Sequence, residues 1–380
     1  MERLGNETVQ IVHPSPIKSK AAGIEVIDTD FHFLPDYQSL RSFMREPFRT
    51  KLPRYPQVGS EYAPDAAISM VGTGQSVQGE ARTGEEILRV IDEIGVDTVI
   101  VSPGFQRPQS IFNEAVISEL SSAYNDFLIQ EVFPVSDRIK GEIMINQRDP
   151  LAAAAEIRRV GHHRSFVSVY SEFGGTYEPI GSAKHDPIFD ALQEFDFPLS
   201  VHVGTFWQQW SPLSIGARTW VELLGISPMG TAMASMGSMI MQGLFDKYPS
   251  QMILMKEGGL WWIVEFMLRV DEFYLSHPGD VQLVERKVES GEQYLNKLPS
   301  EYLLENFRFS TQPMCTPKDP KHLQWLFELC HGEELFLYSS DWPHATFDPI
   351  NWVFDSHLPE SVQKKIFSEN ARKLFKRLQS

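Results

Sequence analysis

Short runs rich in β-branched residues alternate with longer helical patterns from about residue 24 to the end of the chain. We predict strands at 24–30, 97–102, 139–145, 165–171, 198–203, 251–256, 306–311 and 334–340. Helical patterns fall at 84–94, 115–131, 151–160, 185–195, 231–246, 260–276, 318–331 and 360–378. Such alternation is typical of βαβ units with a parallel sheet. Eight strand and helix pairs predict an α/β fold, a closed (β/α)8 TIM barrel, whose active site lies at the carboxyl ends of the strands.

Two long connections interrupt this rhythm. Residues 33–83 follow the first strand and are rich in proline, arginine and aromatic residues, and residues 277–305 precede the seventh strand. Long excursions in compact domains are usually functional or disordered, and after a barrel strand we expect them to cover the mouth. We predict one barrel domain over residues 24–380, decorated by these loop insertions and preceded by a flexible polar segment, residues 1–23.

The charge of the chain limits its partners. Its 380 residues carry 34 basic and 50 acidic side chains, a net charge of −16, and the basic residues are scattered. This balance argues against nucleic acid and anionic membranes as partners and leaves a small-molecule substrate.

The two cysteines, Cys315 and Cys330, form no CxxC motif, which argues against a disulfide framework and a cysteine-based zinc site. The first twenty residues lack an apolar core of signal-peptide length, and no apolar run approaches the ~20 residues of a membrane span. We therefore expect a soluble cytoplasmic protein.

Reactive side chains gather at the carboxyl ends of the predicted strands. Asp30 and His32 stand at the end of the first strand, one residue apart, and on an extended backbone they point to the same face. The other reactive strand ends are those of the fifth strand with His202, the sixth with Lys256 and Glu257, and the eighth with Asp341. In a barrel, all of these side chains meet at one mouth.

Two imidazoles and two carboxylates make a mixed nitrogen and oxygen site for a divalent metal. Such a site suits Zn²⁺, Mn²⁺ or Fe²⁺ better than Ca²⁺. We expect one ion, with zinc first and manganese or iron as alternatives, and an open position for water. Bound water has its pKa lowered to about 7 in good cases, and Glu257 is a natural base to deprotonate it.

Each of these residues also has a structural explanation when taken alone. Asp30 and Glu257 are candidates for helix caps or turns, Asp341 for the turn before a proline, and His202 for a hydrogen-bonded core histidine. Their coincidence at the same end of the barrel favours the metal site.

Several motifs carry a resemblance to a known family. They run from residue 24 to residue 378 and read DTDFH, FPLSVHVG, LFDKYPSQMILMKEGGLWWI, FRFSTQP, YSSDWPHATFD and FSENARKLF. In this order they resemble the amidohydrolase superfamily. The similarity is greater to its amidohydrolase-related (amidohydrolase 2) branch, which contains aminocarboxymuconate semialdehyde decarboxylase and γ-resorcylate decarboxylase.

The resemblance implies a (β/α)8 barrel with one divalent metal held by Asp30, His32, His202 and Asp341. Two positions depart from the family pattern. Asp30 stands where the first strand usually has histidine or glutamate, and Glu257 replaces a histidine of the named decarboxylases.

The glutamate on the sixth strand bears on the reaction. Its carboxylate would bind the metal or repel an anionic substrate. Strict alternation would point Lys256 to the opposite face, where it could not compensate the charge of Glu257. This weakens the transfer of decarboxylase activity from the family.

Other candidates complete the predicted site. His344 lies three residues past Asp341 and could donate a proton or orient substrate. The predicted substrate contacts are two arginines of the first long connection that could pair with a carboxylate, two aromatic residues after the fifth strand that could wall a pocket, and a glutamine after the seventh strand: Arg45, Arg49, Phe206, Trp207 and Gln312.

The leading hypothesis is hydrolysis of a lactone, ester, amide or related carbonyl compound by metal-activated water. Glu257 or Asp341 would take the proton and His344 would assist the oxyanion or leaving group. The alternative is nonoxidative decarboxylation of an aromatic or unsaturated carboxylic acid, in which a proton replaces CO₂. A third hypothesis is a catalytically silent binding barrel. We also predict a homodimer, as in the family that the chain resembles.

Overall fold

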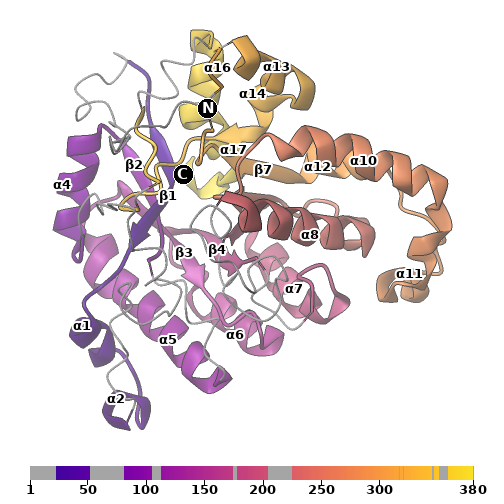
Figure 1. Ribbon diagram of the computed structural model, residues 1–380. Coiled ribbons are helices and arrows are strands. Elements are labelled where there is room, and N and C mark those ends of the chain that lie inside the picture. The colour runs from indigo at the N-terminus through magenta and orange to yellow at the C-terminus, as the bar shows by residue number, and fades with distance from the viewer. Residues whose placement is uncertain are drawn as a thin grey trace, which may run out of the picture.

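The computed structural model describes residues 23–51, 81–104, 113–173, 178–203, 225–315, 317–319, 321–344, 346–350 and 358–379. Within them, eight strands pair in sequence order from β1 to β8, and every pair is parallel. The helices lie around this sheet (Figure 1). The predicted (β/α)8 barrel is therefore confirmed.

The strands are β1 (Ile27–Phe33), β2 (Thr98–Pro103), β3 (Ile139–Met144), β4 (Phe166–Glu172), β5 (Leu199–His202), β6 (Ile253–Lys256), β7 (Phe307–Ser310) and β8 (Phe336–Leu337). The helices that follow strands β2 to β7 include α5 (Glu114–Phe127), α6 (Pro150–Val160), α7 (Asp186–Phe195), α8 (Ser227–Met241), α10 (Trp262–Ser276) and α13 (Lys321–Cys330). Helix α4 (Gly84–Ile94) precedes β2, and α16 (Glu360–Lys364) and α17 (Asn370–Leu374) close the chain.

Capping residues mark where several helices begin. The side chains of Thr83, Asn113 and Asp149 each accept a hydrogen bond from a backbone N–H in the first turn of α4, α5 and α6. These bonds satisfy donors that a helix start leaves unpaired. Gly95 ends α4 with a φ of 79°, a conformation that glycine adopts without a steric penalty.

One end of the barrel interior is apolar. The buried cluster there draws side chains from five strands and from the C-terminal segment, and consists of Ile27, Ile100, Val167, Leu254, Leu337, Ala371, Leu374 and Phe375. Removing this surface from water stabilises the barrel. The polar residues of the interior lie in the layers above this cluster.

The last strand is short, and backbone hydrogen bonds continue its pairing with the first. β8 covers Phe336–Leu337 only, but the Asp341 N–H donates to the Asp30 carbonyl at 3.0 Å and the His32 N–H donates to the Trp342 carbonyl at 2.8 Å. These bonds close the barrel and place β1 beside the segment that follows β8 at the mouth.

The structure refines the predicted boundaries. β1 runs three residues later than predicted, so Asp30 and His32 lie inside the strand. The connection at 277–305 is not a plain loop, since it contains the short 3-10 helix η6 (Pro278–Leu283), α11 (Glu285–Ser290) and α12 (Pro299–Asn306). In Figure 1, α10, α11 and α12 extend together from one side of the barrel.

The connection after β1 holds α1 (Tyr37–Ser42) and α2 (Phe48–Lys51), and its residues 52–80 lie outside the described part of the chain, as do residues 1–22 of the predicted N-terminal segment. Among the described helices, none has the length and apolar character needed to cross a bilayer.

Candidate metal centre

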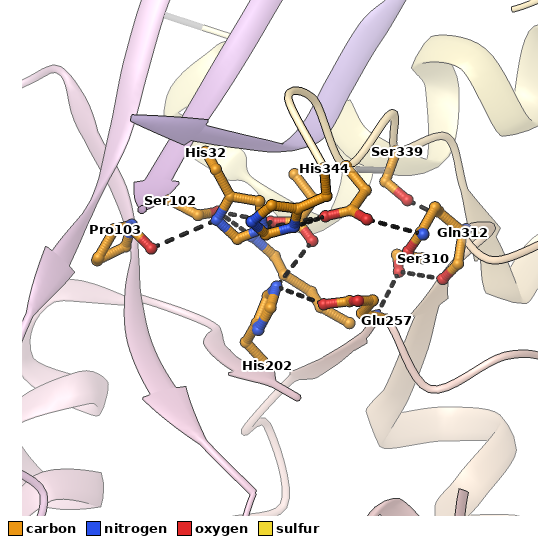
Figure 2. Close-up of polar contacts among 12 residues, drawn as sticks. His32, Ser102, Pro103, His202, Glu257, Ser310, Gln312, Ser339 and His344 are labelled. Carbon is orange, nitrogen blue, oxygen red and sulfur yellow. Dashed lines mark hydrogen bonds and ion pairs between the residues drawn. The ribbon is translucent and has the colours of Figure 1, made fainter. Parts of the chain in front are cut away.

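The four predicted ligands meet at the mouth of the barrel, and Figure 2 shows His32 and His202 there. Asp30 and His32 come from β1, His202 is the last residue of β5, and Asp341 follows β8. The His202 Nε2 atom lies 3.2 Å from Asp30 Oδ2, and His32 Nε2 lies 3.2 Å from Asp341 Oδ1. Ligand atoms that each lie about 2.1 Å from one ion are separated by about 3 Å, so these spacings fit a shared metal.

Backbone carbonyls orient the two histidines. His32 Nδ1 lies 3.3 Å from the Pro103 carbonyl oxygen, and His202 Nδ1 contacts the Val203 carbonyl oxygen. A ring nitrogen that donates to a carbonyl carries the proton, which leaves a lone pair on Nε2 for a metal. Both Nε2 atoms are buried and have no hydrogen-bond partner among the described residues.

Asp341 is held by a set of donors on the loops around it. Gln312 Nε2 and Thr346 Oγ1 donate to its Oδ2 at 2.9 and 2.6 Å, and His344 Nδ1 lies 2.6 Å from Oδ1. Burial alone would raise the pKa of this carboxyl. The neighbouring His344 and His32 outweigh burial and lower the pKa to about 2. Asp341 is therefore a carboxylate at neutral pH, as a metal ligand must be.

Asp30 presents one free oxygen to the mouth. Its Oδ1 accepts a hydrogen bond from Ser102 Oγ at 2.7 Å and lies 3.5 Å from Lys256 Nζ, while its buried Oδ2 has no such partner within the described residues. Burial would raise the pKa of Asp30. Positive charge on Lys256, with smaller contributions from His202 and His32, holds the pKa well below its usual range.

The sequence-based expectation for Lys256 is wrong. Lys256 pairs in register with His202, is fully buried inside the barrel, and places its Nζ 2.9 Å from Glu142 Oε2. The prediction assumed that side chains alternate between the two faces of the strand as far as Glu257. The φ of Glu257 is 53°, which departs from extended backbone, so the alternation stops there. Consecutive side chains therefore both reach the interior.

Glu257 lies beside the four ligands. Its Oε2 is 3.4 Å from His202 Nε2 and lacks a hydrogen-bond partner in the part of the chain that is described. Burial raises the pKa of Glu257 well above its usual value, and the carboxylates of Asp341 and Asp30 add to the effect.

The unpartnered atoms argue that the site fits a metal. Burying a polar atom without a partner costs free energy, so buried polar atoms are nearly always satisfied. Here Asp30 Oδ2, His32 Nε2, His202 Nε2 and Glu257 Oε2 are all buried and unpartnered among the described residues, and they belong to two overlapping groups of candidate metal ligands. A divalent cation would satisfy them together.

The structure describes three of the five predicted substrate contacts. Arg45 pairs with Glu119 at 2.7 Å and Arg49 with Glu46 at 3.1 Å. Gln312 Nε2 donates to Asp341 Oδ2, and its own Oε1 is buried without a partner in the described chain.

The other two predicted substrate contacts, Phe206 and Trp207, lie outside the described residues.

Three residues for which no role was predicted support the site: Ser102, Glu142 and Thr346. Ser102 and Glu142 form the layer beneath Asp30, and Thr346 binds Asp341. A charged residue within a buried strand, such as Glu142 on β3, is the signal that could have found this layer, because buried charges need partners.

The chain is similar in sequence to a known protein family. A family model described as Amidohydrolase matches residues 27–377. Curated relatives include gamma-resorcylate decarboxylases from Polaromonas sp. and Rhodococcus jostii. They are 26% identical over 312 residues and 26% identical over 316 residues, and each match covers 76% of this chain and 86% of the relative.

Solved structures share the fold. A 5-carboxyvanillate decarboxylase from Novosphingobium aromaticivorans, complexed with manganese and 4-hydroxy-3-methoxy-5-nitrobenzoic acid, matches with a TM-score of 0.70 and 20% identity, over 95% of this chain and 99% of that chain. An amidohydrolase from Mycobacterium avium subsp. paratuberculosis matches with a TM-score of 0.70 and 19% identity, over 93% of this chain and 100% of that chain.

These findings contradict the prediction of hydrolysis. The curated relatives are decarboxylases, which agrees with the alternative and not with the leading hypothesis. Decarboxylation was ranked second because Glu257 would stand at the mouth without a compensating charge. Lys256 in fact lies in the same interior, beneath the mouth, where its ammonium group pairs with Glu142 and Asp30.

Metal analysis tests this site. We expect protein purified without added metal to carry about one equivalent of a divalent ion per chain, and His202→Ala or Asp341→Ala to lose it, because each removes a ligand that the remaining residues cannot replace. Inductively coupled plasma mass spectrometry measures the content. His277→Ala, at an exposed position after α10, should keep the metal. A parent that cannot be loaded, or variants that bind as it does, would contradict the assignment.

Proposed function

This chain belongs to the amidohydrolase family, and we propose that it is an enzyme that catalyses metal-dependent, nonoxidative decarboxylation of an aromatic or unsaturated carboxylic acid. The observation that carries the proposal is the group of buried, unpartnered ligand atoms at the barrel mouth, in a chain whose curated relatives are named decarboxylases. Solved neighbours bind 2-nitroresorcinol and 4-hydroxy-3-methoxy-5-nitrobenzoic acid, which supports a substrate of this size.

We propose Asp30, His32, His202 and Asp341 as the ligands of one divalent ion. Zinc was expected first, but manganese is now favoured because solved neighbours hold it. A mixed histidine and carboxylate set accommodates either ion. When bound, the ion would withdraw electron density from oxygens of the substrate.

Decarboxylation breaks the bond between the carboxylate carbon and its neighbour, CO₂ leaves, and a proton takes its place. The chain must therefore deliver a proton beside the metal. We propose His344 for this role. Its Nδ1 is bound to Asp341, its ring lies 4.2 Å from that of His32, and its partial exposure leaves Nε2 able to face a substrate. Asp341 would then both bind metal and orient His344.

Glu257 is the second candidate for holding the proton. Its position next to His202 and its raised pKa make it a carboxyl group that gives up a proton when a developing negative charge lies nearby. Gln312, whose Oε1 is unpartnered among the described residues, stays a proposed substrate contact.

The homodimer and the cytoplasmic location stay predictions. Helix α10 and the residue before it expose Trp261, Leu268 and Leu275 at intervals of seven residues, which gives the chain an apolar stripe on that side.

Product analysis tests the reaction. We expect the manganese-loaded protein to release CO₂ and decarboxylated product in equal amounts from 2,6-dihydroxybenzoate or 5-carboxyvanillate, two acids named for relatives of similar fold. A chelator should abolish the release and Mn²⁺ should restore it, because the ion would supply the electron withdrawal from the substrate that the reaction needs. The methyl esters of the same acids are the controls and should be inert. Turnover of esters or lactones without CO₂ would refute the proposal.

The proton donor has its own test. His344→Asn should lower kcat by about 10²–10⁴-fold and leave KM and metal content close to those of the parent, because asparagine keeps a polar contact but cannot transfer the proton. Steady-state kinetics with metal analysis separates the two effects, and His277→Asn is the matched control. A variant with the parent's kcat would remove His344 from the mechanism.

A further inference from the structure

A buried layer of charged and polar side chains lies directly beneath the proposed ligands. Lys256 Nζ is 2.9 Å from Glu142 Oε2, 3.0 Å from Ser102 Oγ and 3.5 Å from Asp30 Oδ1. All four residues are fully buried, and they come from β6, β3, β2 and β1. This layer separates the metal ligands from the apolar end of the barrel and links strands from both halves of it.

The hydrogen bonds in this layer have a defined direction. An ammonium group only donates, so Lys256 donates to Ser102 Oγ and to Glu142. The Ser102 hydroxyl has a single hydrogen, and its shorter contact is the one to Asp30 Oδ1, at 2.7 Å against 3.0 Å to Glu142. Ser102 therefore accepts a hydrogen bond from Lys256 and donates one to Asp30.

Both donors approach the same oxygen of Asp30. Oδ1 receives Ser102 and faces Lys256, whereas Oδ2 is buried, has no hydrogen-bond partner within the described chain, and lies 3.2 Å from His202 Nε2. The contacts with Ser102 and Lys256 thus fix the orientation of the Asp30 carboxylate. Glu142, which also accepts from Ser168 Oγ at 2.8 Å, supplies the negative charge that lets Lys256 remain buried.

We propose that Lys256 is a positioning residue that, with Ser102, makes Asp30 a metal ligand through Oδ2 alone. The inference rests on the proposed metal-dependent function. Groups that hold the outer atoms of a metal ligand set its orientation and affinity. Without the two donors, the Asp30 carboxylate can turn and offer both oxygens, which changes the coordination number.

A simpler alternative is that the Lys256 and Glu142 pair only holds the strands together. A purely structural pair affects the free energy of unfolding, but it does not affect the coordination of a metal in the variants that still fold. The spectrum of a bound metal therefore separates the two explanations.

The experiment uses the full chain loaded with Co²⁺, whose visible absorption weakens as the coordination number rises. We expect Lys256→Met to weaken metal affinity by about 10–100-fold in a chelator competition and to lower the absorption per bound ion. Ser102→Ala should move both readouts in the same direction and by less. Leu254→Met is the matched control, since Leu254 lies two residues earlier on β6, in the apolar cluster, and it should leave both readouts unchanged.

A further variant keeps the test decisive. If Lys256→Met does not fold, Lys256→Met/Glu142→Gln removes both charges together and should show the same spectral change. Parent-like affinity and spectrum in the folded Lys256 variant and in Ser102→Ala would overturn the inference. The readout does not depend on catalysis, so a parent that binds Co²⁺ or Mn²⁺ but releases no CO₂ would refute the proposed function and leave this inference standing.

Discussion

The closure of the barrel between its last and first strands is the constraint on which the site depends. Asp341 and Trp342 hydrogen-bond through their backbones to Asp30 and His32, and this contact brings together proposed ligands that lie far apart in the sequence. The stacked rings of Phe31 and Trp342, 4.6 Å apart, reinforce it. Because ligand atoms must be placed within tenths of an ångström, a metal centre of this kind needs a closed and well-packed barrel.

The interior is divided into layers with different physical character. Apolar side chains fill one end, a paired layer around Lys256 and Glu142 follows, and the unpartnered ligand atoms lie at the mouth. Buried charges cost free energy unless they are paired, so the lysine layer and a bound cation together account for the acidic residues in this dry environment. The same layers place His344, at the partly exposed mouth, where a substrate can reach it.

Sequence reasoning succeeded where periodicity decides the outcome. The eight strands and the meeting of Asp30, His32, His202 and Asp341 followed from alternating patterns and from the rule that barrel strands carry their sites at their carboxyl ends. It failed where one backbone angle or a tertiary contact decides the direction or the partner of a side chain. The positive φ of Glu257 turns its side chain to the same interior as Lys256, and the first prediction of the reaction rested partly on the expectation that the two residues face opposite ways. The pairing of Arg45 with Glu119, far along the chain, has no local signal that could announce it.

The measurement that tests this account most directly is X-ray absorption spectroscopy at the metal edge of the manganese-loaded protein. The account predicts scattering from the imidazole rings of His32 and His202 together with nearer carboxylate oxygens, and no contribution from sulfur. A first shell made of oxygen alone, without imidazole scattering, would contradict it, because the metal would then lie away from the histidines that define the proposed centre.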